Sequence, residues 1–252
     1  MNLRRRRPLM GFAAVFVAFP LSVPAALSSQ DFLFRRPVVT VGVHGGWAMP
    51  SASSDIFEEV RESFTIGSDA FGSTTWGGEV AFRLTERLDV AAGLEYAQGS
   101  TRSEYRDVVD IDDNPIEQTT TLRRIPLTLS VRGYLFERGR TVSRFAWVPN
   151  AWSPYVGAGA GYLWYRFDME GDFVNFDDPD WPIFTDRLRS DGTAPTAHVL
   201  AGIEASLTER FLLRGEYRHS WASSDLDTSA FSGYDPIDLG GGRATIGVAV
   251  RM

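Results

Sequence analysis

The sequence predicts an all-β protein, an eight-stranded antiparallel transmembrane up-and-down β-barrel with long extracellular loops. Three observations lead to this class: eight stretches alternate apolar and polar residues, long and short connections alternate between them, and an export signal precedes them. Period-two alternation turns one face of a strand toward lipid and the other toward an interior. An even number of strands is typical of single-chain bacterial barrels.

The N-terminus has the order of a secretion signal. Arg4 to Arg7 form a basic segment, residues 9–19 are mostly apolar, and small residues follow. The apolar run is shorter than the roughly 20 residues of a membrane-spanning helix, so we expect removal rather than retention. The predicted organisation is a cleaved signal peptide, residues 1–28, and a barrel domain, residues 37–252.

Composition excludes several classes of site. Net charge is -7 and becomes -11 once the four signal arginines are removed, because the signal holds no acid. Cysteine is absent, which excludes disulfides, thiolate metal sites and a cysteine nucleophile. An acidic exterior also argues against a nucleic-acid partner.

The alternation places eight strands along the mature chain. In the sixth of them, Leu200 falls on the otherwise polar face. The fourth strand is the clearest, since Leu127, Leu129 and Val131 alternate with Thr128, Ser130 and Arg132. The strands cover residues 38–49, 74–84, 88–98, 119–136, 153–168, 196–206, 211–221 and 242–252.

Connections between these strands differ in length and charge. Two tight turns, at residues 84–87 and 207–210, share the sequence Leu-Thr-Glu-Arg. Residues 137–152 form a longer basic connection that includes Arg138. Four long segments hold 22 of the 32 acids and 5 of the 25 arginines, which is expected of solvated loops on the cell surface. These segments are residues 49–73, 99–118, 169–195 and 222–241.

A soluble lipocalin-type barrel or a sandwich also contains alternating strands, with the apolar residues turned inward. Aromatic residues near the strand ends favour the membrane alternative, because they form girdles at the two lipid interfaces. They are Trp47, Trp76, Tyr96, Trp152, Tyr155, Trp164, Tyr165 and Trp221.

Three segments carry a family resemblance: residues 124–129, residues 154–162, and the stretch from Gly202 to Arg218. Together they resemble the outer-membrane β-barrel domain family, which includes the OmpA-type transmembrane domain and OmpW-like proteins. The resemblance implies a barrel inserted by the outer-membrane assembly machinery, often without a known biochemical activity. Family members commonly end in an aromatic residue that this machinery reads, whereas this chain ends in Met252, so we expect weaker recognition.

The alternation turns nine charged side chains toward the interior. An eight-stranded barrel is only wide enough to be filled by side chains, and unpaired buried ions are unfavourable. We therefore expect a plug of ion pairs, with a gated ion path as the alternative. The nine residues are Glu79, Arg83, Glu95, Arg124, Arg132, Glu204, Arg214, Glu216 and Arg218.

The sequence gives little indication of catalysis. Lipid A deacylases carry a lipid-facing His and Ser two residues apart, whereas His219 and Ser220 are adjacent and point to opposite faces. His219 is therefore expected at the membrane interface, and His44 and His198 lie in separate strands without a partner at ligand spacing. No catalytic residue, metal ligand set or cofactor is predicted.

Two acidic segments raise a cation hypothesis. Residues 110–114 and 177–180 could bind Ca²⁺ or Mg²⁺ and bridge to lipopolysaccharide phosphates, although both lack the glycine and distal glutamate of a calcium-binding loop.

The favoured function is a non-enzymatic integral outer-membrane protein with a plugged interior and a structural or surface-interaction role. Expected partners are outer-membrane lipids, lipopolysaccharide and the assembly machinery, and a monomer is expected. Two alternatives stay open: a small channel for ions or hydrophobic solutes, and a lipid A-modifying enzyme.

Overall fold

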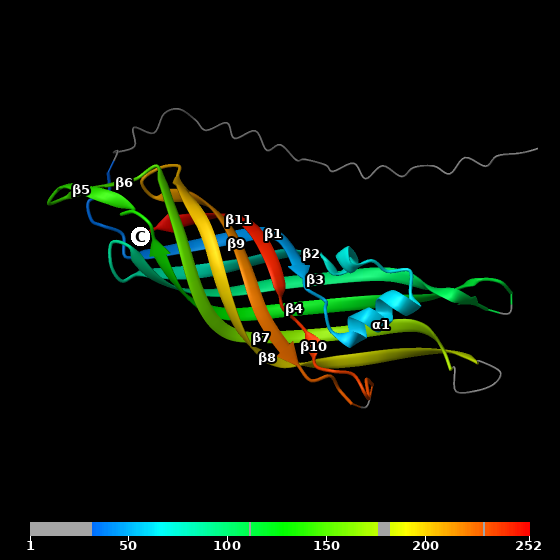
Figure 1. The fold of residues 1–252 in the computed structure, drawn as a ribbon. Helices are drawn as coiled ribbons and strands as arrows, with labels where there is room; N and C mark the ends of the chain where they lie inside the picture. The colour runs from blue at the N-terminus through cyan, green and yellow to red at the C-terminus, as the bar shows by residue number, and fades with distance from the viewer. Residues whose placement is uncertain (1–31, 111, 176–181, 229) are drawn as a thin grey trace, which may run out of the picture. The chain divides into compact units, whose positions relative to one another are not determined.

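The computed structural model describes residues 32–110, 112–175, 182–228 and 230–252, so the predicted signal peptide lies outside the described residues. Within them, eight long strands form a barrel (Figure 1). The strands are β1 (Val39–Pro50), β2 (Ser73–Arg83), β3 (Leu88–Val109), β4 (Pro115–Tyr134), β7 (Trp152–Val174), β8 (Ile183–Ser206), β9 (Phe211–Ser224) and β11 (Gly241–Arg251).

Each barrel strand pairs antiparallel with the next one along the chain, and β11 pairs with β1 to close the ring. The closing register sets Thr40 opposite Arg251 and Pro50 opposite Gly241. Closure leaves no sheet edge, as a membrane interior requires, because no water is there to satisfy free backbone groups. The predicted fold class is confirmed.

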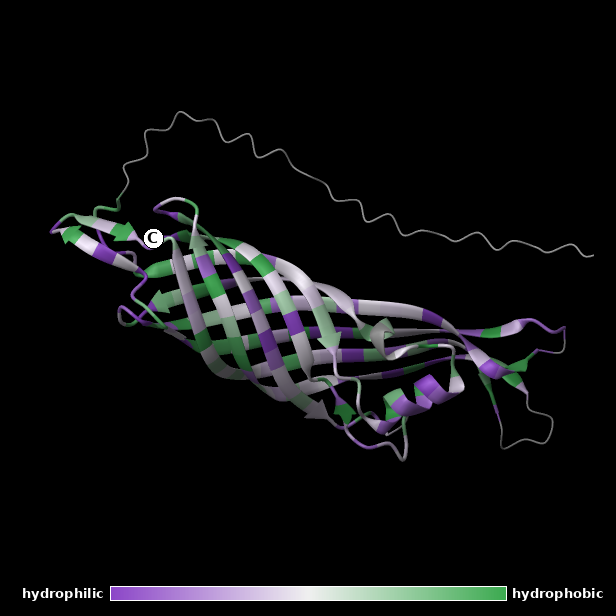
Figure 2. Cartoon of the chain, turned by 45° about the horizontal axis from the view of Figure 1, so that its top comes forward, coloured by the Kyte–Doolittle hydropathy of each residue, from purple (hydrophilic) through white to green (hydrophobic). Residues whose placement is uncertain are grey.

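Apolar and polar residues alternate along the strands (Figure 2). Large apolar side chains lie exposed on the outer wall, as expected where lipid covers them. Leu200, an exception in the pattern, is buried inside the barrel against Tyr134 and Tyr155. The outward side chains include Val43, Trp76, Phe82, Leu94, Leu129, Val131, Val156, Trp164, Val199, Phe211, Trp221, Ile246 and Val248.

Two of the four segments expected to be loops are largely strand. β3 and β4 continue as a hairpin as far as the pair Val109 and Pro115, and β7 and β8 continue as far as the pair Val174 and Ile183. The expectation failed because the outward face of these extensions is polar, which removes the lipid-facing alternation without interrupting backbone pairing. We call the end with these hairpins the outer end and the end with the short turns the periplasmic end.

The other two long segments fold over the outer end instead of remaining solvated. They contain the helices α1 (Asp55–Ser63) and η1 (Ser68–Phe71) and the short strand β10 (Ile237–Asp238). Phe57 of α1 is fully buried, with ring centroids 4.9 Å from Phe71 and 5.7 Å from the inward-facing Phe167 of β7. No helix within the described residues is long and apolar enough to cross a membrane.

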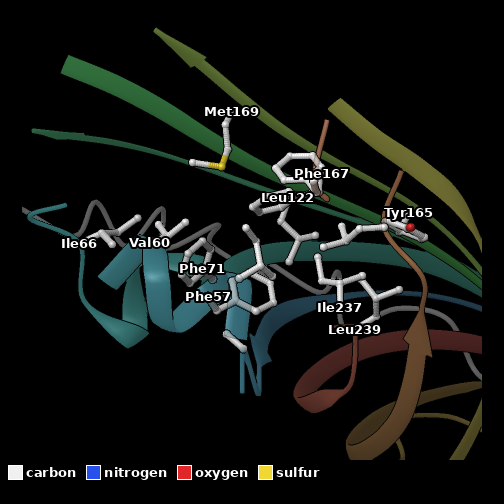
Figure 3. Close-up of a cluster of buried hydrophobic side chains, with 14 of the residues drawn as sticks. Phe57, Val60, Ile66, Phe71, Leu122, Tyr165, Phe167, Met169, Ile237 and Leu239 are labelled. Atoms are coloured by element: carbon white, nitrogen blue, oxygen red, sulfur yellow. The ribbon is translucent and has the colours of Figure 1, made fainter. Parts of the chain in front are cut away.

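This apolar cluster, the outer cap, joins the two segments to the barrel wall (Figure 3). Its central members are Ile56, Phe57, Val60, Phe71, Leu122, Leu163, Phe167, Met169, Ile237 and Leu239. The outer part of the interior is therefore packed with apolar side chains.

The basic connection after β4 forms a hairpin, β5 (Gly139–Ser143) and β6 (Ala146–Pro149), at the periplasmic end. Trp147 of β6 is 2% exposed and lies against the guanidinium groups of Arg83 and Arg251. Its backbone pairs with that of Leu33. We call Arg138 and Trp147, which both reach into the barrel from this connection, the periplasmic cap.

Candidate functional site

The nine charged residues predicted for the interior all lie on inward faces of the barrel strands, and seven of them join one set of ion pairs. We call this set, with four further members, the lumen network. The seven are Glu79, Glu95, Arg132, Glu204, Arg214, Glu216 and Arg218, and the added four are Asp89, Arg138, Arg243 and Arg251.

Arg132 is the centre of the network. Its two terminal nitrogens donate to both carboxylate oxygens of Glu79, at 2.5 and 2.6 Å, and Nη2 also donates to Glu216 at 2.7 Å. Arg132 belongs to β4, while Glu79 and Glu216 belong to β2 and β9, which are not its neighbours in the sheet. These bonds therefore cross the lumen instead of running along the wall.

Glu79 also accepts from Arg214, which donates in turn to Glu204 at 2.6 Å. Tyr155 donates to Glu216 at 2.9 Å, and its ring lies under the Arg132 guanidinium at 5.2 Å. Each of these bonds has an ionised partner, which makes it stronger than a neutral hydrogen bond.

At the periplasmic end the network includes a pair that the sequence analysis did not place. Arg138, from the connection after β4, donates to both oxygens of Asp89 at 2.6 and 2.5 Å. Tyr134 links this pair to the rest, since its hydroxyl lies 2.9 Å from Glu204 and 3.4 Å from Asp89. The basic composition of residues 137–152 is the sequence feature that could have indicated the pair of Arg138 and Asp89.

Toward the middle of the barrel, Glu95 is shared by two arginines and a histidine. Arg243 pairs with it directly, His44 Nε2 lies at 3.3 Å and Arg218 at 3.8 Å. Arg218 donates to Glu216 at 2.8 Å, so this part is continuous with the pairs around Arg132.

Two predicted members do not join an ion pair among the described residues. Arg83 faces the periplasmic end, where its guanidinium lies 5.1 Å from the Trp147 ring centroid. Arg124 lies toward the outer end and donates to the carbonyl oxygens of Leu239 and Gly240 at 3.2 and 3.4 Å.

The space left inside is small. One cavity of about 40 Å³ lies in the outer half of the barrel, beside Arg124, and another of about 10 Å³ lies near Glu79 and His44. One water needs roughly 10–15 Å³ by this measure, so the two cavities have room for a few waters.

The histidines and Ser220 form no catalytic set within the described residues. His219 points outward and contacts the Trp221 ring at 4.8 Å, whereas Ser220 points inward and donates to the Gly241 carbonyl at 3.3 Å. His198, for which no partner was expected, lies inside with Nε2 2.8 Å from the hydroxyl of Ser130. Ser130 and His198 lie 68 residues apart in the sequence, so only the register of the strands brings them together.

Of the two acidic segments considered for cations, residues 177–180 lie outside the described residues. In the other, Asp110 accepts from the backbone N–H groups of Asp112 and Asn114 at 2.8 and 2.7 Å. Hydrogen bonds from Asn114, backbone and side chain, lower the pKa of the Asp110 carboxyl. The described residues contain no group of three metal-ligating side chains.

A closed barrel with an apolar outer wall, an ion-paired lumen and extended outer hairpins defines an integral β-barrel of a membrane. The family model described as outer membrane protein beta-barrel domain matches residues 12–234. The chain belongs to this family, and it is a protein of the outer membrane.

Solved structures of outer-membrane barrels are similar at low identity. OprG from Pseudomonas aeruginosa shows 15% identity over 87% of this chain and 99% of its own, with a TM-score of 0.47. Neisserial surface protein A shows 15% identity over 85% and 96%, with a TM-score of 0.41. Outer membrane protein W from E. coli shows 14% over 87% and 100%, with a TM-score of 0.38. The comparison with curated protein sequences finds no significant match.

Proposed function

We propose that this protein is a non-enzymatic outer-membrane barrel with a closed lumen, whose role is structural or lies in surface interactions. The observation that carries the proposal is the set of ion pairs that joins β2, β4 and β9 across the lumen. The outer cap and the periplasmic cap support it, since each fills one end of the barrel.

Permeation would have to break these pairs. Arg132 is 0% exposed and Glu79 is 7% exposed, and separating a buried pair costs about 3–5 kcal/mol because each charge loses its partner without regaining water. An ion crossing the barrel meets several such pairs in succession. The cavities of about 40 and 10 Å³ are far smaller than a continuous aqueous channel would be.

Recordings of the purified protein in planar bilayers test the closed lumen. We expect no stable conductance for the wild-type chain. Trp147→Ala, which removes the ring of the periplasmic cap but none of the ion-paired side chains around Arg132, should also remain silent. A stable, large conductance of the wild-type chain would contradict the proposal.

For the surface role we propose lipopolysaccharide as a partner, recognised through its phosphates. Arg123 on β4 and Arg166 on β7 are direct cross-strand partners on the outer wall. They lie two residues beyond Ile125 and Trp164, which are also cross-strand partners and face lipid. The arginines thus stand at the level where lipid headgroups begin.

Neither arginine forms an ion pair among the described residues, and the acid opposite Arg166 on β8 is Asp191. Arg123 Nε donates to the amide oxygen of Gln98 at 2.9 Å, and Arg166 Nε is buried without a hydrogen-bond partner among the described residues. Like charges directly opposite each other destabilise a sheet, and arginine binds phosphate through two parallel hydrogen bonds. A phosphate between the two guanidinium groups would relieve the repulsion.

The test compares lipid A bound to protein extracted from the outer membrane, measured by mass spectrometry. The double variant Arg123→Gln, Arg166→Gln should carry several-fold less lipid A than wild type. Arg102→Gln, a surface arginine already paired with Glu117, is the matched control and should be unchanged. Equal lipid A on all three folded proteins would remove lipopolysaccharide as a partner of this pair.

A further inference from the structure

The charges of the barrel interior do not balance. Eight arginines face inward in the described chain against five carboxylates, which leaves three positive charges in excess. The arginines are Arg83, Arg124, Arg132, Arg138, Arg214, Arg218, Arg243 and Arg251, and the acids are Glu79, Asp89, Glu95, Glu204 and Glu216. Charges held away from water are strongly unfavourable without counter-charges.

One of the three excess charges, that of Arg124, lies in the outer half of the lumen. The cavity of about 40 Å³ is lined by Arg124, Arg218 and Arg243, and no carboxylate lines it. Arg218 and Arg243 each have a carboxylate elsewhere, Glu216 and Glu95 respectively. Arg124 has none and is 9% exposed.

The surroundings of Arg124 supply acceptors but no ion-pair partner among the described residues. It donates to two backbone carbonyls, of Leu239 and Gly240, through a single nitrogen, Nη1. Asp238, the nearest acid acting on it, is beyond ion-pair distance and is bonded to Ser53 Oγ at 2.5 Å and the Gly240 N–H at 2.9 Å. Counting Asp238 as an interior acid still leaves an excess of two positive charges.

We propose that this cavity binds a small inorganic anion of halide size, held by Arg124 with Arg218 and Arg243. Hydroxyl donors of Thr128 and Thr196 also line the cavity, so an anion there would meet hydrogen-bond donors as well as cations. The volume admits roughly three water-sized groups, which fits a halide with one or two waters and excludes a sugar acid. The inference does not require a closed lumen, because the excess charge is present whether or not the barrel conducts.

Equilibrium unfolding of the full mature chain tests the site, with chloride as the probe. The protein is folded into detergent micelles and unfolded with urea in sodium chloride or in sodium gluconate at equal ionic strength. A ligand that binds only the folded state raises its stability with concentration. We expect the unfolding midpoint to rise with chloride concentration relative to gluconate and then level off.

Arg124→Gln should abolish the chloride-dependent rise. Arg251→Gln, which removes an interior arginine that does not line the cavity, should keep it. Equal midpoints in the two salts for the wild-type chain, or an undiminished rise in Arg124→Gln, would overturn the proposal.

Crystals of the wild-type chain grown in sodium bromide give an answer that does not depend on a variant folding. The proposal expects an anomalous bromide peak among the guanidinium groups of Arg124, Arg218 and Arg243. Diffraction that shows bromide elsewhere on the molecule, and water alone in this cavity, would refute it.

Discussion

Replacing Glu79 with glutamine removes the carboxylate that two buried arginines share. Arg132 donates two hydrogen bonds to Glu79, and Arg214 donates a third. Glutamine keeps the side-chain length and one acceptor oxygen but removes the negative charge. The interior excess then rises from three positive charges to four.

The structure sets the size of the expected loss. Removing one partner of a buried ion pair costs about 3–5 kcal/mol, chiefly because the other charge is left uncompensated. Arg132 retains Glu216 and Arg214 retains Glu204. We therefore expect a loss near the lower limit, about 3 kcal/mol of unfolding free energy.

The assay is equilibrium urea unfolding in phospholipid bilayers. Glu86→Gln is the matched control, because Glu86 pairs with Arg36 at the surface, where both side chains are more than 40% exposed. Exposed pairs contribute about 0–1 kcal/mol, so the control should differ little from wild type. If Glu79→Gln cost no more than Glu86→Gln, the lumen network would not be a buried, mutually compensating set.

Three further outcomes are expected. Phe57→Ala should weaken the outer cap by about 3–5 kcal/mol, the usual cost of removing a buried ring. The loop that carries α1 should then become sensitive to protease, while the barrel keeps its heat-modifiable gel migration. Unchanged proteolysis would argue against the cap. Arg138→Gln leaves Asp89 buried without its bidentate partner and should lower the unfolding free energy by about 3–5 kcal/mol, whereas the exposed Arg140→Gln should leave it unchanged. The hydrogen bonds to the Asp110 carboxylate favour its ionised form and so lower its pKa. They stabilise the hairpin turn at pH values above the ordinary aspartate pKa, and this contribution is lost as the pH falls through the lowered pKa. A carboxyl NMR titration midpoint at or above 3.8 would contradict this.

The sequence was sufficient for the barrel wall because lipid imposes a simple rule on every spanning strand. Residues such as Val131 must face lipid, and Arg132, one position along, must then face the lumen. This rule predicted the inward side of nine charged residues. It could not tell which of them meet, because Arg132 and Glu216 lie 84 residues apart and contact each other only through closure of the ring.

The ends of the barrel followed other rules. The apolar face of the short helix α1 consists of Ile56, Phe57 and Val60. A face of that size does not indicate which residues it packs against, and the partners Phe167 and Ile237 are known only from the structure. The segment therefore resembled a solvated acidic loop, since Asp55 and its neighbouring acids lie on the opposite face.

Arg138 was visible only as one basic residue in a long connection. Nothing in its local sequence indicated that the connection returns to the barrel mouth and reaches Asp89.

The central claim, that apolar faces meet lipid and charged faces meet one another inside, can be measured directly on β4. Because the chain contains no cysteine, spin labels can be attached one at a time through cysteine at residues 127–131 in lipid vesicles. Collision with oxygen should be high at Leu127, Leu129 and Val131 and low at Thr128 and Ser130, as their exposed and buried positions require. The opposite phase, with oxygen reaching Thr128 and Ser130 and not the leucines, would contradict the account.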